Sequence, residues 1–192
     1  NGQGLWLEGN EVMLHGCLFV ENDASSGGAF AAQQGNAVIL STCNFTNNRA
    51  VSTGGGAVVL TADSNTITIT NSILHGNSAH GCGGAIASTG SNVAYLQGAS
   101  ISFNTAGAGG ALCLQGSSAF GFRNATTVLE GNEAISLGGA IALIASPLWF
   151  VSDHVRVHIV GNQAPRGSAL YFEALTRTSS NTIRRSLGHH AA

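Results

Sequence analysis

The acidic side chains are the first candidates for chemistry in this chain of 192 residues. A glycan-cleaving site needs two carboxylates that face each other across the bond to be broken. The nine acids are Glu8, Glu11, Glu21, Asp23, Asp63, Glu130, Glu133, Asp153 and Glu173. Glu21 and Glu133 lie beside asparagines of a repeated pattern described below, but four copies of that pattern separate them, and the other acids occupy unrelated positions. We therefore predict that the protein is not an enzyme, and we retain a carbohydrate-cleaving site as the alternative.

The histidines and cysteines lack the spacing of a metal site or a redox motif. The histidines in the body of the chain are His15, His75, His80, His154 and His158, and His189 and His190 follow near the end. They occupy unrelated places in the repeat, and the four cysteines include no CxxC pair. We expect no catalytic group, no metal ion and no cofactor.

Two cysteines nevertheless stand at equivalent positions of successive copies. If the copies stack, the Cα atoms of Cys17 and Cys43 lie about 5 Å apart, within the range that a disulfide accepts. Two buried free thiols are the other interpretation, and we favour it. Cys82 precedes a Gly-Gly pair and Cys113 falls on the outward side of a strand, so these two share no column; they are expected to be free or to pair between chains.

Two sequons are candidate sites of N-glycosylation. Asn44-Phe45-Thr46 places its asparagine between two inward residues, so Asn44 is expected to point outward and to be the better acceptor. The second triplet begins at Asn124.

One segment alternates threonine with isoleucine, from Thr66 to Thr70. The outward positions of its neighbours would be Ala37, Ile39 and Ser41 on one side and Val93, Tyr95 and Gln97 on the other. Such a face has no flat threonine array, so ice binding is not favoured.

The elements that position these residues come from a repeat of 26 to 30 residues. Gly-Gly-Ala followed by an apolar residue begins at Gly27, Gly55, Gly83, Gly109 and Gly138, with a degenerate copy at Gly167. Five to seven residues earlier stands an asparagine that follows a large apolar residue by three. These asparagines are Asn22, Asn48, Asn77, Asn104, Asn132 and Asn162.

Alternating side chains around these landmarks predict short strands. In the first copy Cys17 and Phe19 share one face before Asn22, and Leu14 precedes them. In the last two copies Asn124 and His154 replace that leucine, and a one-residue slip would keep the face apolar. The residues after Gly-Gly-Ala alternate again. Each copy therefore predicts two or three strands and no helix.

A repeat this short cannot bury its own apolar face, so the copies must stack. The predicted fold class is all-β, a right-handed parallel β-helix of about six to seven coils. The six asparagines would form a ladder at one corner, because asparagine tolerates left-handed backbone angles and its amide can hydrogen-bond along the stack. We assign residues 1–172 to this domain, as a fragment of a longer chain, and residues 173–192 to a degenerate coil or linker.

The joint occurrence of apolar-x-x-Asn and Gly-Gly-Ala-apolar, over about residues 12–172, resembles the repeat of the chlamydial polymorphic outer membrane proteins. The resemblance implies a right-handed β-helix displayed on a cell surface and linked to adhesion. This chain differs from the chlamydial pattern in having no lysine.

Composition narrows the partners. Only 8% of the residues are charged and the formal net charge is −2, which argues against nucleic acid as a partner. No apolar run is long enough to insert into a membrane. We expect a non-enzymatic structural or adhesive solenoid that is extracellular or on the cell surface. Its expected partners are other domains or copies of surface proteins, and glycans are the alternative partners.

Overall fold

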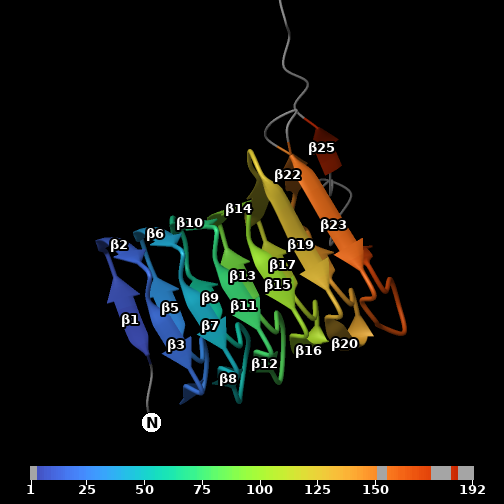
Figure 1. The fold of residues 1–192 in the computed structure, drawn as a ribbon, viewed down its shortest axis with the longest axis horizontal. Coiled ribbons are helices and arrows are strands. Elements are labelled where there is room, and N and C mark those ends of the chain that lie inside the picture. The colour runs from blue at the N-terminus through green and yellow to red at the C-terminus, as the bar shows by residue number, and fades with distance from the viewer. Residues whose placement is uncertain (1–3, 151–154, 174–182, 186–192) are drawn as a thin grey trace, which may run out of the picture.

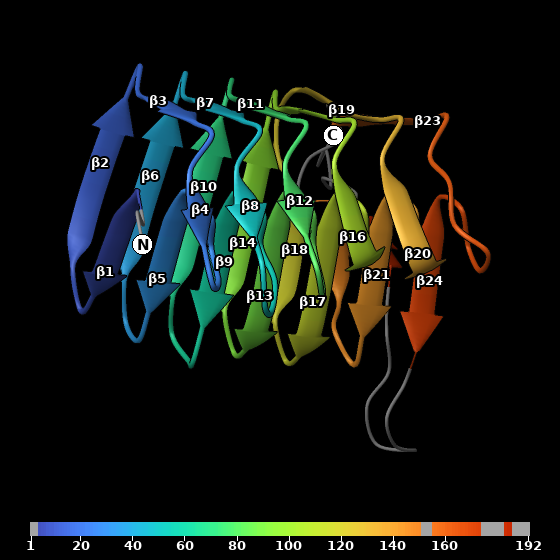
Figure 2. The same ribbon diagram turned by 90° about the horizontal axis from the view of Figure 1, so that it is seen from below.

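The computed structural model describes residues 4–150, 155–173 and 183–185. These residues form a parallel β-solenoid of about six turns, and they contain no helix. Figure 1 shows the coils following one another along the long axis from the N-terminal strands to the C-terminal ones. Figure 2, turned by 90°, shows that each coil passes through four sides before it steps to the next.

Each side of the solenoid is one parallel sheet, here named A to D in the order in which the chain visits them. Sheet A contains β1 (Leu5–Glu8), β5 (Phe30–Gln33), β9 (Val58–Thr61), β13 (Ile86–Gly90), β17 (Leu112–Gly116), β21 (Ile141–Ile144) and β24 (Leu170–Glu173). Sheet B contains β2 (Glu11–His15), β6 (Ala37–Ser41), β10 (Thr66–Thr70), β14 (Val93–Gln97), β18 (Ala119–Phe122), β22 (Leu148–Phe150) and β25 (Ile183–Arg185).

The two remaining sheets have shorter strands. Sheet C contains β3 (Leu18–Val20), β7 (Asn44–Thr46), β11 (Ile73–His75), β15 (Ser100–Ser102), β19 (Thr126–Glu130) and β23 (Arg156–Val160). Sheet D contains β4 (Asp23–Ala24), β8 (Arg49–Ala50), β12 (Ser78–Ala79), β16 (Thr105–Ala108) and β20 (Glu133–Leu137). A full coil thus has four strands, where the sequence predicted two or three. The missed strands are mostly those of sheet D, whose two-residue members are too short to show an alternation.

The interior consists of columns of like residues. One column consists of the residues that lie three positions before the corner asparagines. In it Phe19 stacks on Phe45, with ring centroids 4.7 Å apart and an interplanar angle of 2°. Phe45, Leu74 and Ile101 continue this column with no exposed surface. Because each side chain meets its counterpart from the coils on either side, a coil buries its apolar face only within the stack.

The Gly-Gly pairs turn the chain from sheet D into sheet A. Gly55 has a φ of 68°, a left-handed angle that glycine adopts without steric cost. A Cβ on Gly56 would run into the carbonyl oxygen of Gly84 in the next coil. The first glycine is therefore required by its backbone angle and the second by the close approach of the next coil.

The predicted one-residue slip near Asn124 is wrong. Leu96 pairs with Phe122, which points inward and is fully buried, while Asn124 is exposed. The corner that takes three residues from Leu96 to Ala99 takes five from Phe122 to Thr127, so two residues are inserted. The inserted residues leave the columns on both sides of the corner intact. His154, the other residue assigned to a slip, lies outside the described residues.

The last strand extends the solenoid beyond residue 173. β25 pairs in parallel with β22, at Leu148↔Ile183 and Phe150↔Arg185. Part of the segment predicted as a degenerate coil or linker therefore joins sheet B.

Candidate functional site

The predicted asparagine ladder lies at the corner between sheets C and D. The backbone N–H and the side-chain amide of Asn48 both donate to Oδ1 of Asn77, each at 2.9 Å. Asn77 repeats this toward Asn104 at 2.8 and 2.9 Å, and its amide also donates to the Phe45 carbonyl. The same bonds run from Asn22 to Asn162. From Asn48 to Asn132, each Oδ1 thus accepts from the asparagine of the preceding coil, and each residue donates to Oδ1 of the asparagine in the following coil.

The left-handed backbone angles at this corner belong to the residues that precede the asparagines. Glu21, Asn47 and Phe103 have φ between 53° and 55°, and glycines occupy the same position in other coils, as at Gly76 with φ 64°. The asparagines are not among the residues with positive φ. Their role is therefore to hold successive coils together at this corner through amide hydrogen bonds. The expectation that they supply the unusual backbone angle is wrong.

A second asparagine ladder, which sequence reasoning missed, lies at the corner between sheets A and B. Asn36 donates from its backbone N–H and its amide to Oδ1 of Asn65, and Asn65 does the same to Asn92. Asn10 joins through its backbone N–H. The spacings of 26, 29 and 27 residues equal those of the first ladder from Asn22 to Asn104, so aligning the copies would have revealed it.

Cys82 and Cys113 form a disulfide, with Cα atoms 5.5 Å apart. The expectation that these two do not pair within the chain is wrong. These two residues are not stacked in one column, but the loop before Gly83 folds over the outer face of sheet A. Cys82 thereby lies beside the outward Cys113 of the next coil.

Cys17 and Cys43 are free thiols, and the candidate disulfide between them is not formed in the structure. They occupy one inward column at the corner between sheets B and C, as predicted. Burial is the main cause that raises the pKa of the Cys43 thiol, so it stays protonated. Cys17 is half-buried and is the more accessible of the two.

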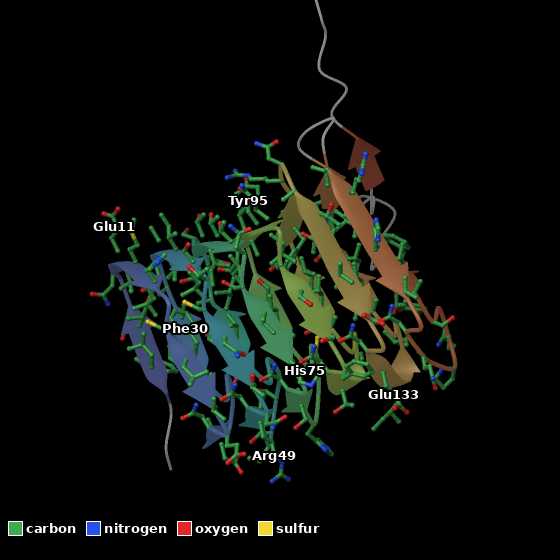
Figure 3. All side chains as sticks on the ribbon, in the orientation of Figure 1. Glu11, Phe30, Arg49, His75, Tyr95 and Glu133 are labelled. Atoms are coloured by element: carbon green, nitrogen blue, oxygen red, sulfur yellow. A yellow bond between two sulfur atoms is a disulfide. The ribbon has the colours of Figure 1, made fainter. Side chains whose placement is uncertain are left out.

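Among the strands that the structure describes, no two acids occupy neighbouring positions of one column. Asp23 and Glu133 share the outward column of sheet D, but Arg49, Ser78 and Thr105 stand between them. Four strand spacings amount to about 19 Å, beyond the ~9.5 Å that separates paired catalytic carboxylates. In Figure 3, Glu11 and Tyr95 lie along one side of the stack and Arg49 and Glu133 along the opposite side. The absence of catalysis stays a prediction.

Two of the described histidines bond to neighbouring hydroxyl groups. Nδ1 of His75 lies 3.0 Å from Oγ of Ser102, and Nδ1 of His15 lies 3.3 Å from Oγ1 of Thr42. Within the described ranges, no three His, Cys, Asp or Glu side chains gather as ligands for a metal ion. That no metal or cofactor binds remains a prediction.

The two sequons differ in exposure. Asn44 is half-buried within sheet C, between Leu18 and Ile73, and Thr46 donates to its Oδ1 at 2.5 Å. Asn124 is exposed in the two-residue insertion, with a φ of 27°. The structure therefore favours Asn124, contrary to the expectation from alternation alone, and glycosylation of either residue stays a prediction.

The outward face of sheet B has the predicted register. Thr68 pairs with Ile39 on one side and with Tyr95 on the other, as its alternation indicated. The Arg123 guanidinium lies over the Tyr95 ring, 3.3 Å from its centroid, a cation–π contact. The threonines of β10 thus have no threonine counterparts in the strands beside them.

The described residues line hollows on two sides of the solenoid. One, of about 240 Å³, is lined by Arg49, His80 and Ile135 with small neighbours on sheet D. The other, of about 450 Å³, lies over the outer face of sheet A beside the disulfide. Neither was foreseen from the sequence, because each depends on how the loops between sheets D and A fold over their neighbours.

No family model, curated protein or solved structure matches this chain. The parallel β-solenoid agrees with the fold that the repeat's resemblance implies, and the resemblance is supported at that level alone. Among the described residues, no helix is long and apolar enough to cross a membrane.

Proposed function

We propose that this chain is a non-enzymatic structural or adhesive solenoid of an extracellular or cell-surface protein, and that its coils build a larger assembly by stacking end to end. The repeat pattern that resembles the chlamydial polymorphic outer membrane proteins supports surface display. The partners are then other domains or copies of surface proteins.

The polarity of the ladders carries this proposal. In the first coil Oδ1 of Asn10 and Oδ1 of Asn22 accept no hydrogen bond from the described residues, whereas their counterparts Asn36 and Asn48 accept bonds from the preceding coil. A coil with asparagines at the same positions would donate to both oxygens. The free acceptors therefore fit the donor side of a like coil, whether that coil precedes this segment in the same chain or belongs to another copy.

The apolar residues at the same end also support the proposal. Val12, Leu14 and Phe19 face the interior but are only half-buried, while Val38, Leu40 and Phe45 of the next coil have at most 2% of their surface exposed. Strand edges that display both unpaired backbone groups and apolar side chains are templates for further pairing. A stacked coil would satisfy both.

The disulfide supports the proposed extracellular location. Cys82–Cys113 is of the kind that persists in oxidising surroundings, outside the cytosol. The low charge suits a surface that packs against similar surfaces, and the exposed Asn124 suits a glycoprotein.

Stacking is tested by charging the open end. Val12→Lys places an ammonium group among the half-buried residues of β2, which a stacked coil would have to desolvate. Met13→Lys is the matched control, because Met13 neighbours Val12 on the same strand but points outward with 71% of its surface exposed. We expect the unchanged chain and Met13→Lys to form rods that lengthen with concentration, and Val12→Lys to remain monomeric.

Analytical ultracentrifugation and negative-stain electron microscopy provide the measurements. A monomeric unchanged chain at all concentrations would overturn the proposal. So would rods formed equally well by Val12→Lys, because stacking would then not use this end.

A further inference from the structure

We propose that the hollow over the outer face of sheet A is a binding site for a neutral glycan. It spans β9, β13 and β17, and two loops between sheets D and A, at Ser52–Gly54 and Gly81–Cys82, form its wall. Its volume of about 450 Å³ lies within the range of small-ligand sites. This inference is independent of the stacking proposed above, which uses the end of the solenoid and not its side.

The hollow is lined by uncommitted polar side chains. Ser52, Thr53, Thr61, Thr89 and Gln115 all line it, and none of their side chains makes a hydrogen bond to the described residues. Four free hydroxyl groups and one free amide can both donate to and accept from a ligand that is rich in hydroxyl groups.

The floor is apolar and the lining is uncharged. Val59 and Ala87 supply methyl groups beneath the polar rim, and together with Ala31 they form a small apolar cluster. None of the lining residues carries a formal charge. A sugar ring presents C–H groups on its faces and hydroxyl groups at its edge, so it complements both features, whereas a charged ligand would find no counter-ion.

An extended peptide fits less well because the backbone of the wall is already paired. The N–H of Cys82 donates to the Thr53 carbonyl, the N–H of Gly55 to the Cys82 carbonyl, and the N–H of Ala108 to the Gly81 carbonyl. Strand addition requires a free edge of backbone groups. The groups left free here belong to side chains, which favours the glycan.

The disulfide holds the wall in place. Cys82 lies in the second wall loop, and Cys113 lies on β17 two residues before Gln115. The bond therefore fixes the distance between the wall and one polar group of the rim. Sites that are rigid before the ligand arrives bind with a smaller entropic cost.

The test uses ¹⁵N-labelled protein with Val12→Lys, so that stacking or its failure does not affect the outcome. Cellohexaose, maltohexaose and mannohexaose serve as neutral probes, and hexagalacturonate serves as the anionic comparison. We expect at least one neutral hexasaccharide to shift the amide resonances of Ser52, Thr53, Cys82, Thr89 and Gln115 in a saturable manner at about 10 mM, which detects a Kd of about 1 mM.

Variants then locate the site. Thr89→Trp changes an exposed residue and fills the hollow, so we expect it to raise the Kd at least tenfold. Thr68→Trp on the outer face of sheet B is the control and should change the Kd by less than twofold. Reduction of the disulfide should raise the Kd several-fold while the far-ultraviolet circular dichroism stays the same.

The proposal is overturned if no neutral hexasaccharide shifts these resonances, if hexagalacturonate binds them equally well, or if Thr89→Trp leaves the Kd unchanged. A response of the same resonances to a Ser/Thr-rich hexapeptide, with none to the sugars, would overturn it in favour of a peptide site.

Discussion

Two corners of the solenoid use the same device to different extents. Between sheets C and D the asparagine ladder continues through six coils, from Asn22 to Asn162. Between sheets A and B the ladder ends at Asn92, and the same position is then held by Ser118 and Ser146. A corner can therefore lose its ladder where other contacts hold the coils together.

The contacts that replace the second ladder are visible at the step where it ends. Ser118 bonds through its hydroxyl to Ser88 and to the carbonyl of Gly90, at 2.9 Å each. The disulfide joins the loop before β13 to β17, so it crosses the same step between coils. A covalent link thus lies where the amide ladder is interrupted.

The largest effect is expected from breaking the continuous ladder. Asn77→Ser removes an amide that bonds to Asn48, Asn104 and the Phe45 carbonyl, all of them buried. Because unpaired buried groups cost about 1 kcal/mol or more each, we expect the free energy of unfolding to fall by about 4 kcal/mol. Asn92→Ser, at the end of the other ladder, should lower the free energy of unfolding by about 2 kcal/mol, because fewer hydrogen bonds are lost. Ser118 of the next coil already holds the equivalent position with a serine.

Urea denaturation followed by circular dichroism measures both variants. Hydrogen exchange gives a local readout, because the amide proton of Asn48 donates to Asn77 and should lose its protection in Asn77→Ser alone. Equal losses in the two variants would contradict the difference between the corners.

The next effect concerns the disulfide. Cys82→Ala together with Cys113→Ala opens a covalent loop of 31 residues, and this is expected to lower the free energy of unfolding by about 3 kcal/mol. Peptide mapping without reduction should recover Cys82 linked to Cys113, and iodoacetamide should modify Cys17 in the folded protein. A linked Cys17–Cys43 peptide would show that the pairing differs from the structure.

A smaller effect is expected at the corner between sheets B and C, which has no ladder. The Thr127 hydroxyl is buried there without a hydrogen-bond partner in the described part of the chain, so Thr127→Val should raise the free energy of unfolding by about 1 kcal/mol. Ser72 occupies the same column but donates to the Thr70 carbonyl and accepts from the N–H of Cys43. Ser72→Ala should therefore lower stability by about 1 kcal/mol. The same sign for both variants would rule out this explanation.

The sequence predicts the parts of this molecule that repeat. The interior columns, the Gly-Gly corners and the first ladder recur in every copy, so their positions follow from alignment alone. The second ladder, from Asn10 to Asn92, also repeats and could have been found in the same way. Two other missed features depend on a single coil: Cys82 meets Cys113 because one loop folds outward, and Asn124 is exposed because two residues are inserted. The hollow beside the disulfide has the same origin. Repetition reveals the scaffold, whereas candidate sites arise where a coil departs from it.

The smallest effect tests backbone strain at the corner without a ladder. Thr42 has a φ of 53°, whereas Gly16 and Gly98 hold the same place in other coils. A β-branched residue in the left-handed region costs about 1–2 kcal/mol, and glycine returns part of this as chain entropy. We expect Thr42→Gly to raise the free energy of unfolding by about 0.5 kcal/mol, or Tm by roughly 1–2 °C. Asn71→Gly should have almost no effect, because asparagine with a φ of 48° tolerates this conformation. Differential scanning calorimetry of the two variants measures the difference, and a gain in Asn71→Gly equal to that in Thr42→Gly would exclude side-chain branching as its cause.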